Sequence, residues 1–428
     1  MSRNDAAWQR FFEETDTLAR IEQEGLCHVS ADNLKQVAGR EPRLMAKLDT
    51  LAVRPAVFKR HALTIFPVKN GEYVIFKDPD EKSYYRFSQE ESDLPVTVYD
   101  SQVDLVSFDA YPGSQNLSEC QAIDFAYIAS LIKHFTGDDR LSQVIRGRLF
   151  SGDFGFHLPA SERRVDVSGV QIEVDAGYES PDGLYLIEAK VGKRDDFHIR
   201  QLYYPFLEWS NRSRKRIVPI FLVYTNGKYY LYEFSFSGEF GVLHVAQSGC
   251  FAINESPIAR IDVAALLRTL SVGTEPPVPY PQANDLDKVA DLVPRVESEL
   301  GTKADIADYF EFDERQGDYY ANAGRYLGFL EREDGRYVVT DLGRQFVHTR
   351  SIAGKSRLLI EQLLTRPTFR AIFELLLQRN LELDAVSNEE IAAAIAQFTG
   401  LSGTTPGRRA STVRSWLRWL LENSEIVM

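Results

Sequence analysis

The sequence predicts a mixed α/β fold, in which helices and strands share the same domains. Two Asn-Gly pairs, Asn70-Gly71 and Asn226-Gly227, each separate two apolar runs, which is a strong short-range sign of a β-hairpin. Apolar residues recur at helical spacing in residues 117–135, between these hairpins, and again beyond residue 300. Helices that alternate with hairpins and further strands are typical of an α/β architecture.

Residues 1–105 are predicted to form a first domain of helices followed by a hairpin. We expect helices over residues 5–24, from residue 31 with Ser30 as N-cap, and near residues 41–51. This order resembles a winged-helix module. Arg43 and Lys47 on its later helix are therefore candidates for contact with DNA. An accessory domain that packs on its neighbour is the alternative.

Residues 106–272 are predicted to form a second domain around a hairpin with the turn Ser180-Pro181-Asp182-Gly183. Proline at the second position and glycine at the fourth fit a type I turn. If the strands pair symmetrically about this turn, Asp175 lies opposite Glu188, with Cβ atoms about 5 Å apart. Side chains alternate along a strand, so Glu188 and Lys190 point to the same face. Two carboxylates and one ammonium group are expected to converge.

The strand that carries Glu188 is apolar along its length. Residues 184–187 (LYLI) run directly into Glu188, which predicts a strand buried on both faces. Burial of an unpaired charge is costly, so charges at the end of such a strand usually pair, bind a metal or take part in chemistry. A solvated Glu and Lys at the edge of the hairpin is the alternative. The aligned Asp175 counts against it.

Asp175 followed by Glu188-Ala189-Lys190 resembles the core motif of the PD-(D/E)XK nucleases, and the chain as a whole resembles a type II restriction endonuclease. Further likeness lies in residues 146–152 (RGRLFSG), 43–49 (RLMAKLD) and 65–67 (IFP). Val174 stands where the family name has proline, a position at which the family often has another residue.

The resemblance implies a Mg²⁺-dependent enzyme that hydrolyses phosphodiester bonds. Asp175 and Glu188 would hold Mg²⁺, a cation that prefers oxygen ligands, and Glu173 on the same face would be a further ligand. An ion pair between Glu173 and a nearby arginine is the alternative. Lys190 would orient the nucleophile and stabilise the transition state.

Two further candidates lie in helices that flank the hairpin. Glu119 stands near the start of the helical stretch 117–135 and matches the acidic residue that family nucleases often take from a first helix; favourable charge at a helix N-terminus is the alternative. Gln201, in a helix expected over residues 197–206, resembles a motif glutamine of related nucleases, although Pro205 stands where a tyrosine usually follows. His198 is more often a packing or surface histidine than a general base.

The C-terminal part is predicted to follow a Pro-rich linker, residues 273–284. In residues 285–350, helices over 302–310 and 316–330 precede a short hairpin with the turn Glu333-Asp334-Gly335, so this region also resembles a winged helix. Acidic residues offset the arginines of its second helix, which favours a structural or protein-contact role.

Residues 351–428 are predicted to form a helical, winged-helix-like domain that ends in a basic helix over residues 408–420. Apolar residues at helical spacing along this helix predict a buried stripe. The candidates for contact with DNA phosphates and bases are Arg408, Arg409, Ser411, Thr412, Arg414 and Arg418. A solvated basic helix is the alternative.

Composition limits the classes of function. The net charge is −13, which does not favour nucleic acid overall, so basic islands at residues 31–60 and 405–420 must supply the contacts. Cys27, Cys120 and Cys250 lie far apart, which argues against a zinc site and a disulfide scaffold. No run approaches the roughly 18 apolar residues of a membrane span. We expect a cytoplasmic protein without a membrane partner.

The expected function is cleavage of double-stranded DNA at a specific sequence by a type II restriction endonuclease with Mg²⁺ as cofactor. Cutting both strands makes a homodimer natural, and a cognate DNA methyltransferase is expected in the same system. The alternatives are a repair or modification-dependent nuclease of the same core, a winged-helix DNA-binding regulator with an inactive core, and a protein-only scaffold. Intact Asp175, Glu188 and Lys190 argue against an inactive core.

Overall fold

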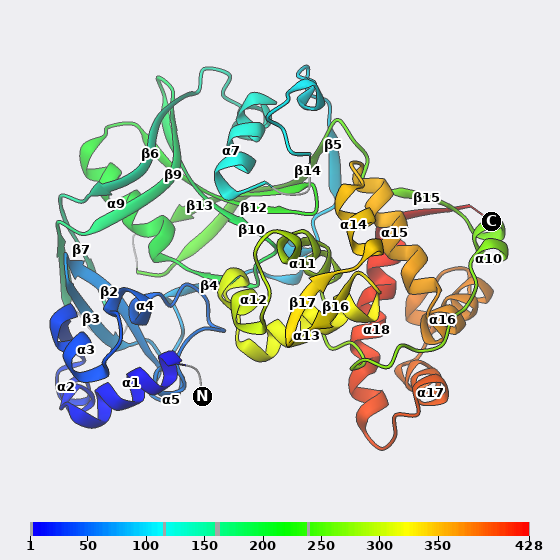
Figure 1. Ribbon diagram of the computed structural model, residues 1–428. Helices are drawn as coiled ribbons and strands as arrows, with labels where there is room; N and C mark the ends of the chain where they lie inside the picture. The colour runs from blue at the N-terminus through cyan, green and yellow to red at the C-terminus, as the bar shows by residue number, and fades with distance from the viewer. Residues whose placement is uncertain (1–2, 114–116, 159–162, 238–239, 428) are drawn as a thin grey trace. The chain divides into compact units, whose positions relative to one another are not determined.

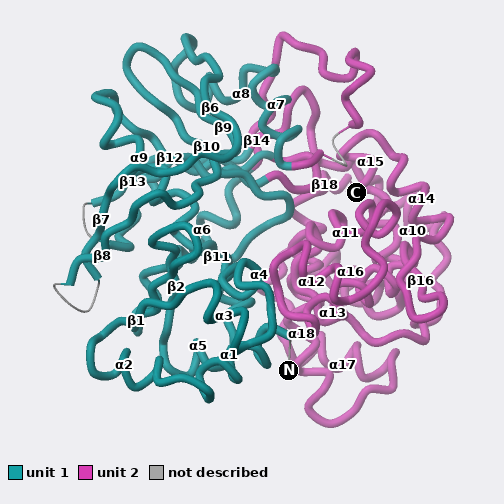
Figure 2. Tube along the Cα trace, turned by 60° about the vertical axis from the view of Figure 1, so that its left-hand side comes forward, with its two compact units in different colours: residues 1–95, 119–223, 229–250 teal, residues 96–118, 224–228, 251–428 magenta. Residues whose placement is uncertain are grey.

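The fold of the chain is mixed α/β, as predicted (Figure 1). A computed structural model describes residues 3–113, 117–158, 163–237 and 240–427. The chain divides into two compact units (Figure 2). Unit 1 comprises residues 1–95, 119–223 and 229–250, and unit 2 comprises residues 96–118, 224–228 and 251–428.

The two units do not follow the predicted domain boundaries. Most of the predicted N-terminal and nuclease domains lies in unit 1. Residues 96–118, 224–228 and 251–272 of these domains belong to unit 2. The predicted linker, residues 273–284, is packed inside unit 2. Glu275 accepts hydrogen bonds from the hydroxyl groups of Tyr326 (2.7 Å) and Thr368 (2.6 Å), and the carbonyl of Ala283 accepts one from Trp416 (2.7 Å). The stiff proline segment is thus part of a packed surface and not a spacer.

Unit 1 begins with an N-terminal module of helices and a three-stranded sheet. Its elements are α1 (Arg3–Glu14), α2 (Thr17–Glu24), β1 (Leu26–Ser30), α3 (Ala31–Ala38), α4 (Pro42–Ala46), α5 (Ala56–Arg60), β2 (Leu63–Lys69) and β3 (Glu72–Lys77). Both β1 and β2 pair antiparallel with β3. As predicted, Ser30 caps α3, accepting a hydrogen bond from the N–H of Asn33 (3.1 Å), and Gly71, with φ of 77°, turns the chain between β2 and β3.

Two helices of this module are shorter than predicted. The stretch over residues 5–24 breaks into α1 and α2, where the hydroxyl of Thr15 bonds to the carbonyl of Phe11 (2.8 Å). The helix expected near residues 41–51 ends at Ala46. Trp8 of α1 lies against Phe58 of α5, with ring centroids 4.7 Å apart, and donates a hydrogen bond to the carbonyl of Met45 (3.0 Å). These contacts fix α4 and α5 to α1.

The large sheet of unit 1 follows the N-terminal module. The elements are β4 (Tyr84–Arg86), α6 (Gln89–Ser92), α7 (Glu119–Ile128), α8 (Leu131–Thr136), β6 (Ser142–Phe150), β7 (Asp153–His157), β8 (Arg164–Ser168), β9 (Gln171–Glu179), β10 (Gly183–Val191), β11 (Asp196–His198), α9 (Arg200–Arg212), β12 (Arg216–Thr225), β13 (Lys228–Phe236) and β14 (Leu243–Ile253). The helix predicted over residues 117–135 is split into α7 and α8 at Ser130, which has φ of 64°.

In this sheet the strands stand in the order β14-β13-β12-β10-β9-β6. The pairs β6–β9 and β9–β10 are antiparallel. The helix α9 connects β10 with its neighbour β12, and helical crossovers of this kind join parallel strands. All nine residues of β10 are buried, as its apolar sequence predicted. The central strand of the sheet therefore carries Glu188 and Lys190 into a buried environment.

One aromatic cluster joins the N-terminal module to the sheet. The ring of Phe66 in β2 lies 4.7 Å from that of His198, centroid to centroid, and also packs on Phe156, Tyr204 and Phe240. The hydroxyl of Tyr204 in α9 donates to the carbonyl of Pro67 (2.8 Å). The module and the sheet thus share a continuous core within unit 1.

Unit 2 is mainly helical. Its elements are β5 (Val96–Tyr99), η1 (Leu105–Ser107), β15 (Ala259–Asp262), α10 (Val263–Thr269), α11 (Leu286–Ser298), α12 (Lys303–Phe310), α13 (Glu314–Tyr326), β16 (Leu330–Glu333), β17 (Arg336–Val339), α14 (Asp341–His348), α15 (Ile352–Leu364), α16 (Pro367–Gln378), η2 (Leu383–Ala385), α17 (Asn388–Thr399), α18 (Thr405–Glu422) and β18 (Ser424–Val427). β15 and β18 pair in parallel. The predicted hairpin is β16–β17, with Asp334 and Gly335 at positive φ in its turn.

Unit 2 buries an ionisable pair. Lys355 of α15 is 3% exposed, and its ammonium group lies 4.9 Å from the ring centroid of Phe346. Burial lowers the pKa of Lys355 to about 7, which the negative charge of Asp291 opposes. Asp291 of α11 accepts hydrogen bonds from the N–H of Asn226 (2.8 Å) and the hydroxyl of Thr225, and burial raises its pKa to about 6.

Substitution of Lys355 by methionine should change how stability depends on pH. Between pH 7 and about 10, unfolded Lys355 holds its proton while the folded side chain has lost it, so this group makes the free energy of unfolding rise with pH. The rise is at most about 1.4 kcal/mol per pH unit. The Lys355→Met variant lacks it. Urea denaturation at several pH values should show that the free energy of unfolding of the wild type rises relative to that of the variant over this range. A difference that does not change with pH would contradict the lowered pKa of Lys355.

Candidate active site

The hairpin of the candidate site, β9 with β10, has the predicted register. The ladder runs from Leu184 with Glu179 to Ile187 with Ala176, and the N–H of Ser180 donates to the carbonyl of Gly183 in the turn (2.9 Å). The next pair in this register is Asp175 with Glu188.

At this point a side chain continues the hydrogen bonding of the hairpin. The carboxylate Oδ2 of Asp175 accepts a hydrogen bond from the backbone N–H of Ala189 (2.8 Å). Asp175 is thereby held against the segment that carries Glu188 and Lys190. The predicted convergence of the three side chains is present.

Glu188 and Lys190 form a buried ion pair. They are 8% and 9% exposed, and 2.6 Å separates Nζ of Lys190 from Oε1 of Glu188. Burial raises the pKa of Glu188 to about 8, and the charges of Asp175 and Glu119 raise it further, against the opposing effect of Lys190. Burial also raises the pKa of Asp175, again opposed by Lys190. One ammonium group only partly balances the carboxylates, so the site favours an additional positive charge.

The first residue of α7 is Glu119, and a bridge from β6 holds this helix on the hairpin. The guanidinium of Arg146 donates two hydrogen bonds to the carboxylate of Asp124 in α7 (2.6 and 3.2 Å) and one to the backbone carbonyl of Asp175 (3.2 Å). The effect of Glu119 on the pKa of Glu188 places its charge near the site. In the sequence, Arg146 was noted only within residues 146–152, a segment that resembles the nuclease family. Asp124 was not predicted as a site residue.

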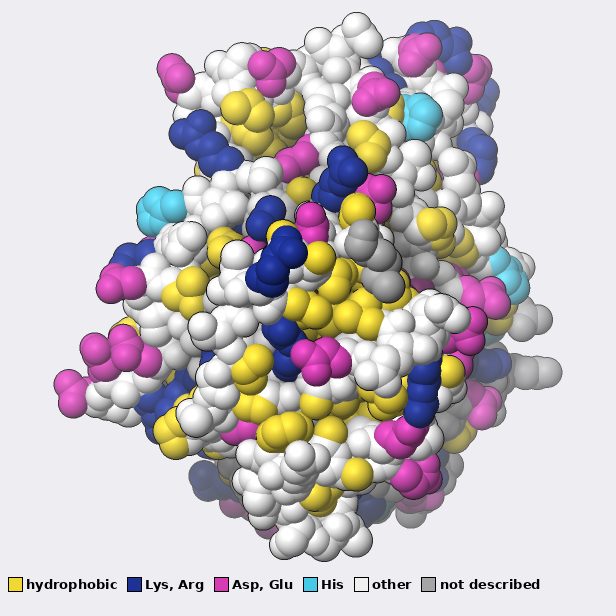
Figure 3. Space-filling view, turned by 90° about the vertical axis from the view of Figure 1, so that its right-hand side faces the viewer, with side chains coloured by type: hydrophobic (Ala, Val, Ile, Leu, Met, Phe, Trp, Pro, Cys, Tyr) yellow, Lys and Arg dark blue, Asp and Glu magenta, His cyan; other side chains and the backbone are white. Residues whose placement is uncertain are grey.

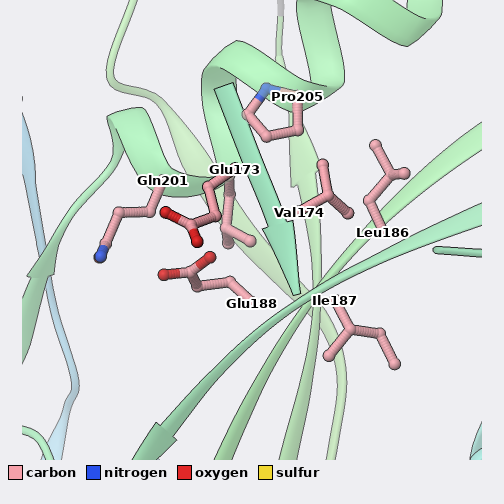
Figure 4. Close-up of a pocket in the computed structure, with 8 residues that line it drawn as sticks. Glu173, Val174, Leu186, Ile187, Glu188, Gln201 and Pro205 are labelled. Atoms are coloured by element: carbon pink, nitrogen blue, oxygen red, sulfur yellow. The ribbon is translucent and has the colours of Figure 1, made fainter. Parts of the chain in front are cut away.

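A small hollow, partly open to solvent, lies beside Glu188. Glu173, Gln201 and Pro205 also line it, and in Figure 4 the carboxylates of Glu173 and Glu188 face one another. Glu173 also forms an ion pair with Arg148 (3.3 Å), which is the alternative expected for it from the sequence. The buried oxygen Oε1 of Gln201 has no hydrogen-bond partner among the described residues, which leaves an acceptor at the hollow.

His198 serves packing, in agreement with its interpretation from the sequence. It belongs to β11 and not to the helix expected over residues 197–206, which begins at Arg200. Its ring lies between Phe66 and Tyr84, and burial holds its pKa well below the usual range. A neutral ring enclosed in this way is not positioned as a general base.

The basic residues of the N-terminal module lie at its surface. Arg43 of α4 and Lys47 just after it are exposed, and Lys47 lies 3.9 Å from the carboxylate of Asp49. Leu44 of the same helix is 52% exposed. The sequence did not single out Leu44, because an apolar residue in an amphipathic pattern is expected to be buried.

The predicted basic helix in unit 2 is α18, which begins three residues before the predicted start. Its apolar stripe is buried, as expected, through Val413, Trp416, Leu417 and Leu420. Arg408, Ser411 and Arg418 are exposed, and Arg409 is partly exposed.

Two predicted DNA contacts of α18 are instead engaged inside unit 2. Thr412 is 3% exposed and donates its hydroxyl to Asn284 (2.6 Å). Arg414 donates to the side chain of Asn388 (2.9 Å) and to the carbonyls of Leu383 (3.0 Å) and Val386. These side chains secure α17 and the segment before α11, and they are not available to DNA.

Figure 3 shows one face of the molecule, where lysine and arginine side chains lie in small groups among acidic and apolar ones.

Comparison with known proteins gives three family models, each described as a domain of unknown function. DUF6996 matches residues 5–75, DUF6997 matches residues 79–251, and DUF7226 matches residues 288–425. No curated protein and no solved structure matches the chain. The hairpin of the candidate site, α7 and α9 all lie within the second match.

Among the described residues, no cluster of three or more His, Cys, Asp or Glu side chains is arranged to hold a metal ion. No helix in the same part of the chain combines the length and apolar character needed to cross a membrane.

Substitutions of Asp175 should separate its role in the fold from its charge. In Asp175→Ala the N–H of Ala189 loses its acceptor, and we expect a loss of about 1–3 kcal/mol in the free energy of unfolding. Asp175→Asn keeps an amide oxygen at this place and should lose much less. Urea denaturation measures both variants, and equal stability of the two would show that the hydrogen bond is unimportant.

Proposed function

We propose that this protein is a Mg²⁺-dependent endonuclease of the PD-(D/E)XK superfamily that hydrolyses double-stranded DNA. The observation that carries the proposal is the convergence of Asp175, Glu188 and Lys190 at one end of the hairpin of the candidate site. The order α7, β6, β9, β10, α9, β12 supports it, since a helix, an antiparallel meander and a helical crossover make up the core of that superfamily. The raised pKa of Glu188 supports it too, because perturbed carboxylates cluster at functional sites.

The residues present fit a magnesium ion. Mg²⁺ is commonly held by one or two carboxylates, with waters and substrate phosphate in its other positions, and Asp175 and Glu188 supply such a pair. Burial raises the pKa values of Asp175 and Glu188, and a bound cation would favour the charged form of both carboxyl groups. When bound, the metal would activate water for attack on the phosphate and neutralise developing charge. Glu119 and Glu173 lie beside the pair, where they can bind waters of the ion.

The side chains of the chain itself would orient the reactants. Lys190 lies on a buried strand and is held by Glu188, so its ammonium group is fixed in place without a loss of side-chain entropy at the moment of reaction. There it can donate a hydrogen bond to a phosphate oxygen. The unpaired amide oxygen of Gln201 can accept one from an attacking water.

The N-terminal module supports duplex DNA as the substrate. Its order of two helices, a strand, three helices and two strands, with β1 beside β3, resembles a winged helix, and α4, which carries Arg43, is the helix that would enter the major groove. Arg43, Leu44 and Lys47 are exposed there. Residues 286–339 of unit 2 form three helices followed by a hairpin, which also resembles a winged helix, and Arg408, Arg409, Ser411 and Arg418 remain candidates for phosphate contacts. Sequence specificity, a homodimer and a partner methyltransferase belong to the same proposal.

The proposal is tested by incubating the purified protein with phage and plasmid DNA, with and without Mg²⁺. Discrete fragments that require Mg²⁺ would support a restriction endonuclease. A smear would favour a non-specific nuclease, and a requirement for modified DNA would favour a modification-dependent enzyme. Tight binding without any cutting would contradict the proposal and favour a regulator with an inactive core.

Lys190→Ala is expected to abolish cleavage while DNA binding stays within a few-fold of wild type. Lys215→Ala is the matched control, because Lys215 bonds to Glu179 and to the carbonyl of Ser180 (2.7 Å) at the other end of the hairpin. It should cut at the wild-type rate. Cleavage assays and binding in Ca²⁺ measure the two effects, and full activity of Lys190→Ala would refute the assigned role.

A further inference from the structure

We infer that Arg43, Lys47 and Arg200 form one surface that binds the phosphate backbone of duplex DNA, and that Asp49 joins this surface to the catalytic hollow. The inference rests on the proposed function and extends it. Arg43 and Lys47 belong to the N-terminal module, whereas Arg200 is the first residue of α9, beside Gln201. One surface would therefore bring together the segment that binds DNA and the helix that lines the site.

Asp49 lies between the two parts of this surface. Its side chain is 8% exposed, and its carboxylate accepts a hydrogen bond from the guanidinium of Arg200 (3.3 Å) and lies 3.9 Å from Nζ of Lys47. Its backbone carbonyl accepts the N–H of His198 (2.8 Å), and Nδ1 of His198 in turn accepts the N–H of Arg200 (3.2 Å). Three hydrogen bonds thus join Asp49, in the segment after α4, to His198 and to Arg200 in the first turn of α9.

Arg43 and Arg200 also act on one side chain, that of Tyr73 in β3. Burial raises the pKa of Tyr73, and the positive charges of Arg200 and Arg43 oppose this rise, so both guanidinium groups lie close to it. The side chain of Arg200 is 27% exposed, and Arg43 is exposed. The two arginines near this half-buried tyrosine, together with Lys47 beside Asp49, make a site of the kind that binds phosphate.

The connection between surface and site is rigid. The N–H of Leu51 donates to the carboxylate of Asp196 (2.7 Å), and the N–H of Ile199 donates to the carbonyl of Ser83 (2.9 Å). His198, which bonds to Asp49 and Arg200, also packs on Phe66 of the aromatic cluster. DNA held by α4 would therefore meet the metal ligands at a fixed position, and cleavage should occur at a constant offset from the bound sequence.

The phosphate contacts are tested by fluorescence anisotropy with a labelled duplex of about 30 base pairs, with Ca²⁺ in place of Mg²⁺. Arg43→Ala and Arg200→Ala are each expected to weaken binding several-fold and to reduce the slope of log Kd against log salt by about 0.9. Arg43 is exposed, so its substitution leaves the core intact. Arg140→Ala is the matched control, because Arg140 is exposed at the turn end of the hairpin, paired with Asp138 and Asp182. It should bind like wild type.

Asp49→Asn tests the positioning role. The backbone bond to His198 remains in this variant, while the charge that holds Arg200 is lost. We expect kcat for cleavage to fall about tenfold with KM unchanged or lower, since removal of an acidic side chain does not weaken binding to DNA. A wild-type kcat would contradict the role of Asp49.

The outcomes distinguish this inference from the proposed function. If the wild type cuts DNA and both arginine variants keep its affinity and salt dependence, the shared surface is refuted while the nuclease stands. If the wild type neither binds nor cuts, the proposed function fails, and this inference fails with it. Weaker binding by both variants, with cleavage retained at high protein concentration, supports the inference.

Discussion

Burial of β10 on both faces is the constraint on which the rest of the site depends. A strand in this position cannot present a charge to water, so the charges at its end must compensate one another. Lys190 bonds to Glu188, and Asp175 is held by the N–H of Ala189. Arg146 then joins β9 to α7, the helix that begins with Glu119. Each of these contacts secures a polar group that would otherwise destabilise the sheet.

The hairpin of the candidate site could be predicted because its determinants are local. The turn at residues 180–183 sets the register, and the register sets which side chains meet. The cap at Ser30 and the turns at Asn70-Gly71 and Asn226-Gly227 were likewise predictable, because each depends on residues close together in the chain. The shape of the site therefore followed from short-range rules.

What could not be predicted depends on contacts between distant residues. The break between α7 and α8 places Ser130 at positive φ, which its sequence does not favour. Arg414 looks like a surface arginine of a basic helix, and only the fold brings the carbonyls of Leu383 and Val386 within its reach. The packing of residues 273–284 and the pairing of Asp49 with Arg200 also depend on residues that are distant in the sequence. In the last case the partners are 151 residues apart.

The aromatic cluster around Phe66 has a consequence for protein engineering. Nucleases whose reading and cutting parts are joined by a flexible tether accept new reading modules with little adjustment. Here Phe66 and Pro67 of the N-terminal module contact side chains of β11 and α9 directly. A module transplanted from a relative would leave Tyr204 and His198 without their packing partners unless it carried matching aromatic residues. Under the proposed function, retargeting this protein would mean redesign of α4 in place, on its native scaffold.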